Sequence, residues 1–239
     1  MTCSATPGRG VFITFEGGDG AGKTTHIRFL ASTLEAHGHE VLCLREPGGT
    51  VIGEKLRAIL LDPAHEEMAP ECELLIYEAA RAQIVNQVIK PALERGAVVL
   101  CDRFYDSTIA YQVHGRGLDE GFTRLANNFA CCGVHPDRTV LMVPPSAQDG
   151  LRRATKTDGA DRIEQAGGDF HERVRQAFAG LAQAEPQRVR TVHSADKKSD
   201  TSRKVFAELA DLFPWFQDML ADPAAFNAVD GPVEGGACG

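Results

Sequence analysis

The stretch FEGGDGAGKTT, from Phe15 to Thr25, follows the first hydrophobic run of the chain and contains four glycines, one lysine and two threonines. Residues 17–24 fit the pattern G-x-x-x-x-G-K-[ST] at every position. Glycines let the backbone turn with positive φ and point successive N–H groups at phosphate oxygens, and the following helix adds its positive dipole end. We therefore expect Lys23 to reach the β- and γ-phosphates of a nucleoside triphosphate and Thr24 to bind Mg²⁺. The residues predicted to form this site are Gly17, Gly18, Asp19, Gly20, Ala21, Gly22, Lys23, Thr24 and Thr25.

Around this loop, short apolar runs alternate with segments of helical pattern. The predicted strands are residues 11–15, 40–44, 97–102, 138–143 and 189–194. The predicted helices cover about 23–37, 50–60, 70–95 with a break near Pro91, 107–111, 119–131, 170–184 and 199–220. This alternation predicts an α/β fold, a five-stranded parallel sheet with helices on both faces. We expect a single domain over residues 1–222 and disorder over residues 223–239, which are rich in glycine, alanine and proline.

Composition narrows the classes of partner. Lys plus Arg total 25 and Asp plus Glu total 33, so the formal net charge is −8. An acidic chain is not built to coat nucleic acid or an anionic membrane, so an anionic ligand must meet a local cluster of positive groups. The seven cysteines form no C-x-x-C pair, which favours reduced thiols in a cytoplasmic protein. We expect neither a signal peptide nor a membrane span, because no segment has the required apolar length.

Two absent motifs and one dipeptide indicate the kind of phosphate-binding protein. The chain has no N-K-x-D guanine-reading motif and no L-S-G-G-Q transporter signature. The third predicted strand ends at Asp102, which is followed directly by Arg103. An acid at the carboxyl end of a strand beside the phosphate loop can lie near the metal, and an arginine can bridge phosphates. We therefore expect Thr24 and Asp102 to bind Mg²⁺. The eight histidines are not spaced like metal ligands, so we assign them no role.

Further strings, taken in their order, resemble those of bacterial thymidylate kinases. They are FEGGDGAGKTT (15–25), REPGGT (45–50), YEAARAQ (77–83), DRFYDSTIAYQ (102–112) and GRG (115–117), with PDRTVLM, DRIEQ and FHERV later. The resemblance covers about residues 11–212 and implies a P-loop nucleotide kinase fold with a small mobile lid. It also implies transfer of the ATP γ-phosphoryl group to thymidylate (dTMP). The nucleophile is then a phosphate oxygen that is ionised at neutral pH, so positioning and charge neutralisation replace a general base.

The resemblance also assigns roles to individual side chains. Asp19 faces the acceptor's sugar, Arg57 grips its 5′-phosphate, and Tyr77 stacks on the thymine. Arg81 hydrogen-bonds the base, Thr108 and Gln112 read its edge, and Tyr111 crowds the ribose 2′ position. The implied dTMP-binding set is Asp19, Arg57, Tyr77, Arg81, Arg103, Thr108, Tyr111 and Gln112. The implied catalytic set is Lys23, Arg103, Arg153 and Asp19.

The expected lid covers about residues 150–164. Some relatives carry an arginine in the phosphate loop, where this chain has Gly20. The chain therefore resembles a second type, in which basic residues of the lid close over ATP. The lid cations are Arg152, Arg153, Lys156 and Arg162, of which we favour Arg153 and Lys156. One departure is MVPPS at the end of the fourth predicted strand, which lacks the acid or amide often found in relatives.

Two alternatives remain open from the sequence. The acceptor can be another deoxynucleotide such as deoxyuridylate, because a pocket discriminates weakly against the loss of one methyl group. A module that binds ATP and transfers nothing is the alternative from a different class. The resemblance further implies a homodimer, which the residues themselves do not indicate.

Overall fold

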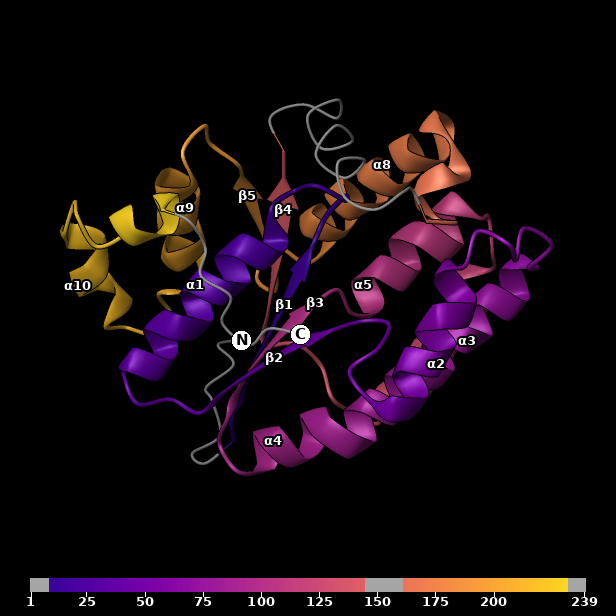
Figure 1. Ribbon diagram of the computed structural model, residues 1–239, viewed down its shortest axis with the longest axis horizontal. Coiled ribbons are helices and arrows are strands. Elements are labelled where there is room, and N and C mark those ends of the chain that lie inside the picture. Colours follow the sequence, from indigo (N-terminus) through magenta and orange to yellow (C-terminus); the bar gives the residue numbers. More distant parts are fainter. Residues whose placement is uncertain (1–8, 145–160, 232–239) are drawn as a thin grey trace.

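The protein is built on a five-stranded parallel sheet with strand order β2-β3-β1-β4-β5 (Figure 1). The structure is a computed structural model, and it describes residues 9–144 and 161–231. The strands are β1 (Val11–Glu16), β2 (Val41–Arg45), β3 (Val98–Asp102), β4 (Arg138–Val143) and β5 (Val189–His193). The predicted five-stranded parallel sheet is therefore confirmed.

Helices cover both faces of the sheet, as the alternating pattern predicted (Figure 1). One face carries α1 (Lys23–Ala36), α9 (Lys198–Leu209) and α10 (Phe216–Ala221). The other carries α3 (Pro70–Ile84), η1 (Val85–Ile89), α4 (Lys90–Glu94), α5 (Tyr105–Thr108), η2 (Ile109–Gly115), α6 (Glu120–Cys131) and α8 (Gly168–Ala184). The remaining helices are α2 (Val51–Leu61), η3 (Glu164–Ala166) and η4 (Asn227–Asp230).

Alternation along the central strands explains the two covered faces. Successive side chains of a strand point to opposite faces, so a doubly covered strand must be apolar throughout. In β3, Val98 and Leu100 pack into the cluster that contains α1 and α9. Val99 and Cys101 pack into the cluster that contains η1 and α4. The continuous apolar runs in the sequence are thus the mark of a sheet buried on both sides.

The predicted break near Pro91 takes the form of a π-helical turn, and the helix runs on through it. Elements α3, η1 and α4 follow one another without a gap from Pro70 to Glu94. The backbone N–H of Lys90 bonds to the carbonyl oxygen of Val85, five residues earlier. Because Pro91 has no N–H to donate, the wider π turn before it accommodates the missing α-helical bond.

The end of the chain differs from expectation at two places. The predicted helix over residues 199–220 is divided into α9 and α10, because the intervening turn contains Pro214. Disorder was expected after Asp222, but the chain continues in a defined course to Gly231. Phe226 is buried against Phe29 and Phe206, so one aromatic side chain anchors this segment to α1 and α9. Among the residues described, no helix is both long and apolar enough to cross a membrane.

Candidate active site

The phosphate loop joins β1 to α1 at the carboxyl edge of the sheet, where open α/β sheets bind their ligands. Gly17, Gly20 and Gly22 have φ values of 126°, 72° and 88°. A β-carbon at Gly17 would lie 2.3 Å from the Met142 carbonyl oxygen, so this position accepts only glycine. The loop therefore has the backbone conformation that its glycines predicted, with α1 starting directly behind it at Lys23.

The Lys23 ammonium group lies inside the curve of this loop. Its Nζ atom is 3.4 Å from the carbonyl oxygens of Gly17 and Gly18 and 3.6 Å from Asp102 Oδ1. Burial and the neighbouring charge of Arg103 lower the pKa of Lys23, although Asp102 and Asp19 oppose that shift. A buried ammonium group that is surrounded mainly by weak carbonyl contacts is well placed to bind phosphate oxygens.

Thr24 and Asp102, the two predicted metal ligands, meet although 78 residues separate them in the sequence. Thr24 Oγ1 donates to Asp102 Oδ2 at 3.3 Å, from the first turn of α1 to the end of β3. A hydroxyl and a carboxylate are the hard oxygen donors that Mg²⁺ takes together with nucleotide phosphates. The residues present therefore fit a Mg²⁺ ion at this edge of the phosphate loop.

Arg103 connects the phosphate loop with a neighbouring pocket. Its Nη2 atom donates to Asp19 Oδ1 at 2.6 Å, and its guanidinium carbon lies 5.1 Å from the ring centre of Tyr111. Its backbone has a φ of 71°, a rare value for a residue with a side chain, and its N–H bonds to the Phe15 carbonyl at 2.9 Å. This conformation directs the side chain across the end of β1 toward the loop. Burial raises the pKa of Asp19, but Arg103 and Lys23 outweigh it and hold that pKa below its usual value.

Glu16 is a buried carboxylate, missed by the sequence analysis, that stabilises the turn next to Arg103. Glu16, at the end of β1, accepts hydrogen bonds from the backbone N–H of Phe104 at 2.7 Å and from Ser107 Oγ at 2.6 Å. Burial and the charge of Asp106 raise the pKa of Glu16 to about 7. Glu16 thus fixes the turn between β3 and α5 that carries Arg103. In the sequence, a carboxylate directly before a glycine loop is indistinguishable from an ordinary loop residue. No sequence pattern therefore indicated the contacts of Glu16 with Phe104 and Ser107.

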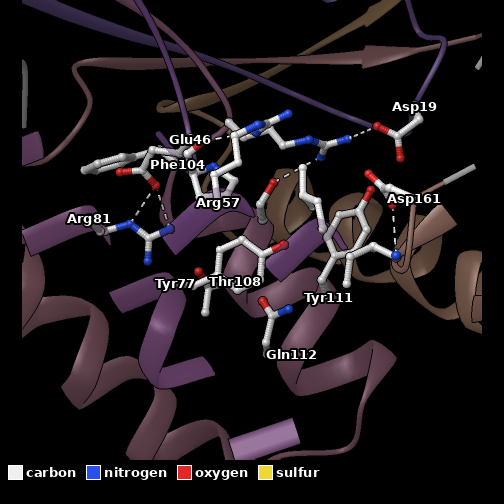
Figure 2. Close-up of a pocket in the computed structure, with 15 residues that line it drawn as sticks. Asp19, Glu46, Arg57, Tyr77, Arg81, Phe104, Thr108, Tyr111, Gln112 and Asp161 are labelled. Atoms are coloured by element: carbon white, nitrogen blue, oxygen red, sulfur yellow. Dashed lines mark hydrogen bonds and ion pairs between the residues drawn. The ribbon is translucent and has the colours of Figure 1, made fainter. Parts of the chain in front are cut away.

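The structure brings all eight residues of the implied dTMP-binding set to the wall of one pocket (Figure 2). They come from the phosphate loop, α2, α3, the end of β3, α5 and η2. Asp19 belongs to both the phosphate loop and the pocket wall, so the two sites adjoin. The wall also contains residues that the sequence analysis did not select, which are Glu46, Pro47, Leu61, Phe104, Ser107, Asp161 and Ile163.

Arg57, on α2, lies in this wall with its positive charge unneutralised by the described residues. Its Nη1 atom donates to the Pro47 carbonyl oxygen at 3.0 Å, and no described carboxylate forms an ion pair with it. Burial and the nearby charge of Arg45 lower the pKa of Arg57 from its ordinary high value. Arg57 and Arg103 both line the pocket, where an anionic group would meet two guanidinium groups.

Arg81 is held in place by a buried polar cluster. Its Nε and Nη2 atoms donate to Glu46 Oε2 at 3.0 and 2.8 Å, and its Nη1 atom donates to Glu78 at 2.8 Å and to Asn127 at 2.7 Å. A guanidinium has five N–H donors, so these bonds leave one donor, on Nη2, without a partner among the described residues. Burial raises the pKa of Glu46 to about 7, against the opposing charge of Arg81. Glu46 and Glu78 are thus the residues that fix the direction of Arg81.

The polar side chains at the far end of the pocket are Thr108 and Gln112, which are 1% and 2% exposed. Gln112 Nε2 donates to Glu73 Oε1 at 2.8 Å. Tyr77 lies in the same wall, four residues before Arg81 on α3, so the two share a helix face as expected.

Of the four predicted lid cations, only Arg162 lies among the described residues. Arg152, Arg153 and Lys156 lie outside the described residues. Arg162 does not match the expectation of a cation that faces ATP, because it is directed toward α2 and α3. Its Nε atom donates to the Leu60 carbonyl at 2.9 Å and its Nη2 atom donates to buried Glu73. In this structure Arg162 therefore secures the end of the expected lid to α2 and α3.

Comparison with known proteins gives one consistent result. A family model described as thymidylate kinase matches residues 15–205. The chain is 45% identical over 203 residues to a thymidylate kinase of Deinococcus radiodurans, covering 85% of this chain and 98% of the relative. It is 47% identical over 203 residues to one of Pseudomonas putida, covering 85% and 96%. A crystal structure of thymidylate kinase from Ehrlichia chaffeensis superposes with a TM-score of 0.70 at 31% identity, covering 84% of this chain and 99% of that one.

Proposed function

The chain belongs to the thymidylate kinase family, and we propose that it transfers the γ-phosphoryl group of ATP to dTMP, giving dTDP and ADP as a step in dTTP synthesis. The observation that carries this proposal is the position of Asp19 and Arg103. They join the phosphate loop to a pocket whose wall contains Arg57, which has no ion-pair partner among the described residues, and Arg103, which bonds to Asp19. The far end of this pocket is polar. A donor phosphate on the loop and an acceptor phosphate in the pocket would meet beside Arg103.

The chemistry asks the protein to align two anions. The acceptor phosphate is already ionised at neutral pH, so no proton has to be removed to make a nucleophile. Lys23 and Arg103 neutralise negative charge on the transferring phosphoryl group. Fixed positive groups in a partly buried site are usually the largest contribution to lowering the activation free energy of such a transfer. When bound with ATP through Thr24 and Asp102, Mg²⁺ would neutralise the donor phosphates further. The alignment of the two phosphates is the protein's main contribution.

At the acceptor end, Arg57 and Arg103 bind the 5′-phosphate of dTMP. Both guanidinium groups lie in the pocket wall, and phosphate is the ligand that a planar guanidinium recognises with two parallel hydrogen bonds. Asp19, held by Arg103, lies between the phosphate loop and the pocket, where the sugar of the acceptor would pass. Tyr111 is buried under Arg103 in the pocket wall, and its ring would crowd the ribose 2′ position of the acceptor.

At the far end, the pocket offers the complement of a thymine edge. The remaining N–H of Arg81 is a donor that suits the O4 atom of thymine. The carbonyl oxygen of Gln112 is an acceptor that suits the N3–H group, and the Thr108 hydroxyl can take either part. Tyr77 supplies an aromatic face for the ring. Cytosine, with a donor at C4 and a bare nitrogen at N3, mismatches both Arg81 and Gln112.

The donor side of the proposal includes the predicted lid. Arg153 and Lys156 would close over the ATP phosphates and exclude water during transfer. Both lie outside the described residues, so their part in the reaction stays a prediction from the sequence.

We further propose that the protein acts as a homodimer in the cytoplasm. Neighbouring helices α2, α3 and α6 carry large apolar side chains exposed to solvent, including Leu125 at 66% and Phe129 at 85%. The others are Val51, Ile52, Ile59, Leu75 and Phe122. Apolar side chains gathered in this way mark an interaction surface, and a second copy of the chain would bury them. The cytoplasmic location follows the cysteine usage of the sequence.

The test of the proposed reaction is the fate of the γ-phosphate. With γ-³²P-labelled ATP, Mg²⁺ and dTMP, the label should appear in dTDP, with one ADP formed for each dTDP. Transfer to deoxyuridylate but not to dTMP would support the alternative acceptor. ATP binding without transfer to any nucleoside monophosphate would support the binding module and contradict the proposal.

A further inference from the structure

The Glu73 carboxylate lies behind the base-reading end of the pocket and is completely enclosed, with 0% of the residue exposed. Its Oε1 atom accepts hydrogen bonds from Gln112 Nε2 at 2.8 Å and from Arg116 Nε at 3.2 Å. Its Oε2 atom accepts from Arg116 Nη2 at 3.0 Å and from Arg162 Nη2 at 2.5 Å. Four N–H donors thus converge on one acidic side chain in the first turn of α3, from Gln112 on η2, from Arg116 directly after η2 and from Arg162 at the end of the expected lid.

These partners determine the charge of Glu73. Burial raises the pKa of this carboxyl, but the hydrogen bonds from Arg116 and Gln112 and the charge of Arg116 outweigh burial and lower it. The group is therefore ionised at neutral pH. An ionised carboxylate has no proton to donate and can only accept hydrogen bonds.

Because the Glu73 carboxylate can only accept hydrogen bonds, it allows a single orientation of the Gln112 amide. An amide has an NH₂ donor end and a carbonyl acceptor end, and either end can face a given neighbour. Beside Glu73, the carbonyl end would place two oxygens against each other in a buried site, which is strongly unfavourable. The NH₂ end must face Glu73, and the carbonyl oxygen is the atom left for the pocket.

We propose that Glu73 is a positioning residue that determines base selectivity by holding the Gln112 carbonyl oxygen, and never its NH₂ group, toward the acceptor base. This inference rests on the proposed function. An oxygen in this place accepts the N3–H group of thymine or uracil and opposes the bare N3 of cytosine. If the amide turned over, its NH₂ group would instead donate to cytosine N3. Glu73 itself does not line the pocket, so its effect on the base passes through Gln112.

The test is the ratio of kcat/KM for dTMP to kcat/KM for dCMP in a Glu73→Gln variant. A neutral amide at position 73 can donate or accept, so Gln112 is free to turn over. The ratio should fall by about tenfold or more, the effect of one hydrogen bond gained or lost. The ratio of dTMP to dUMP should stay within about twofold, because both bases present N3–H at the same place.

Two further variants separate selectivity from general damage. Arg116→Lys alters another partner of the same carboxylate but keeps a positive donor beside it and leaves the Gln112 contact, so it should preserve the dTMP to dCMP ratio. Gln112→Ala removes the oxygen directly and should lower the ratio, and adding Glu73→Gln to it should lower the ratio no further. Gln112→Ala alone leaves the Glu73 carboxylate in place, so it keeps the inference falsifiable if Glu73→Gln folds poorly.

Several results would overturn the inference. Equal reductions of kcat/KM for dTMP and for dCMP in Glu73→Gln would do so, because that pattern belongs to a purely structural role. An unchanged ratio in Gln112→Ala would contradict the base contact itself. If the unsubstituted protein failed to phosphorylate dTMP, the proposed function would fall, and this inference with it. Turnover of dTMP with unchanged ratios in the variants would overturn the inference alone.

Discussion

The guanidinium group of Arg103 donates a 2.6 Å hydrogen bond to the carboxylate of Asp19, and this contact joins the end of β3 to the phosphate loop. Both residues line the acceptor pocket, while Asp19 also belongs to the loop that would hold ATP. The pair therefore stands where donor and acceptor phosphates would meet. Glu16 fixes the turn that carries Arg103, because it accepts hydrogen bonds from the Phe104 N–H and from Ser107 Oγ.

Replacing Arg103 with lysine should lower kcat for dTMP by about 10²- to 10³-fold, the loss measured when one stabilising donor is removed from an active site. Lysine keeps the charge but loses the planar fork that reaches Asp19 and a phosphate together. Steady-state kinetics with saturating ATP would measure the change. The matched control is Arg124→Lys, because Arg124 is an exposed arginine paired with Glu120 and distant from the loop. A kcat within about threefold of the unsubstituted value would contradict this role of Arg103.

Removing magnesium with a chelator should abolish transfer, and the Thr24→Val substitution should raise the Mg²⁺ concentration needed for half-maximal rate by about tenfold or more. The reason is that valine cannot offer the oxygen that Thr24 places beside Asp102. A magnesium titration at fixed ATP would measure the change. Thr33→Val is the control on the same helix, because Thr33 bonds only to the Phe29 carbonyl in the described structure. An unchanged magnesium requirement in Thr24→Val would argue against Thr24 as a ligand.

The contribution of His26 to stability should be lost as pH falls from 8 to 5, whereas the raised pKa values of Glu16 and Glu46 act in the opposite direction. Burial, assisted by the charge of Lys198, lowers the pKa of His26 from 6.5 to about 4. Because its folded pKa is the lower one, its contribution is fully present above pH 6.5 and is lost as pH falls toward 4. For these values the loss between pH 8 and pH 5 is about 2 kcal/mol of unfolding free energy.

Urea unfolding of the His26→Gln variant at the two pH values would isolate this contribution. The change in unfolding free energy between pH 8 and pH 5 should be about 2 kcal/mol more favourable in the variant than in the unsubstituted protein. His114→Gln, at an exposed position, should change by the same amount as the unsubstituted protein. Equal changes in His26→Gln and the unsubstituted protein would show that His26 is not held neutral by burial.

The apolar surface on α2, α3 and α6 should be the dimer contact. A Phe129→Glu substitution places a charge at the most exposed of these side chains, so it should convert the dimer to a monomer at micromolar concentration. Sedimentation equilibrium would measure the change. Gln217→Glu, on exposed α10 at the other end of the molecule, should leave the dimer intact (Figure 1). A monomer in the unsubstituted protein would contradict the proposed homodimer.

Features that depend on neighbouring residues were predictable from the sequence, and features that depend on distant partners were not. The glycine loop and the apolar strands follow from local sequence, and the five strands lie within a residue or so of their predicted bounds. The buried carboxylates Glu16, Glu46 and Glu73 were missed because each is satisfied by donors far away in the chain. Glu73, for example, reads as an ordinary acid in the first turn of a helix.

Composition was also a poor guide to the structure of the C-terminal segment, residues 223–231. Its glycine, alanine and proline content indicated disorder, but a single aromatic side chain decides the outcome for residues 223–231. Phe226 is 1% exposed and packs on two other phenylalanines, and Asp230 accepts a hydrogen bond from the Ser199 N–H at the start of α9. An average over the segment cannot reveal one well-placed anchor.

The most direct test of the account is a competition among acceptors. The protein would receive MgATP and an equimolar mixture of dTMP, dUMP, dCMP, dGMP, dAMP and UMP, and each diphosphate product would be followed by chromatography. The account predicts that dTDP forms first and that dUDP follows more slowly, with little product from the cytosine, purine and ribose acceptors. Preferential phosphorylation of any acceptor other than dTMP, or ADP formation without a nucleoside diphosphate product from the mixture, would contradict it.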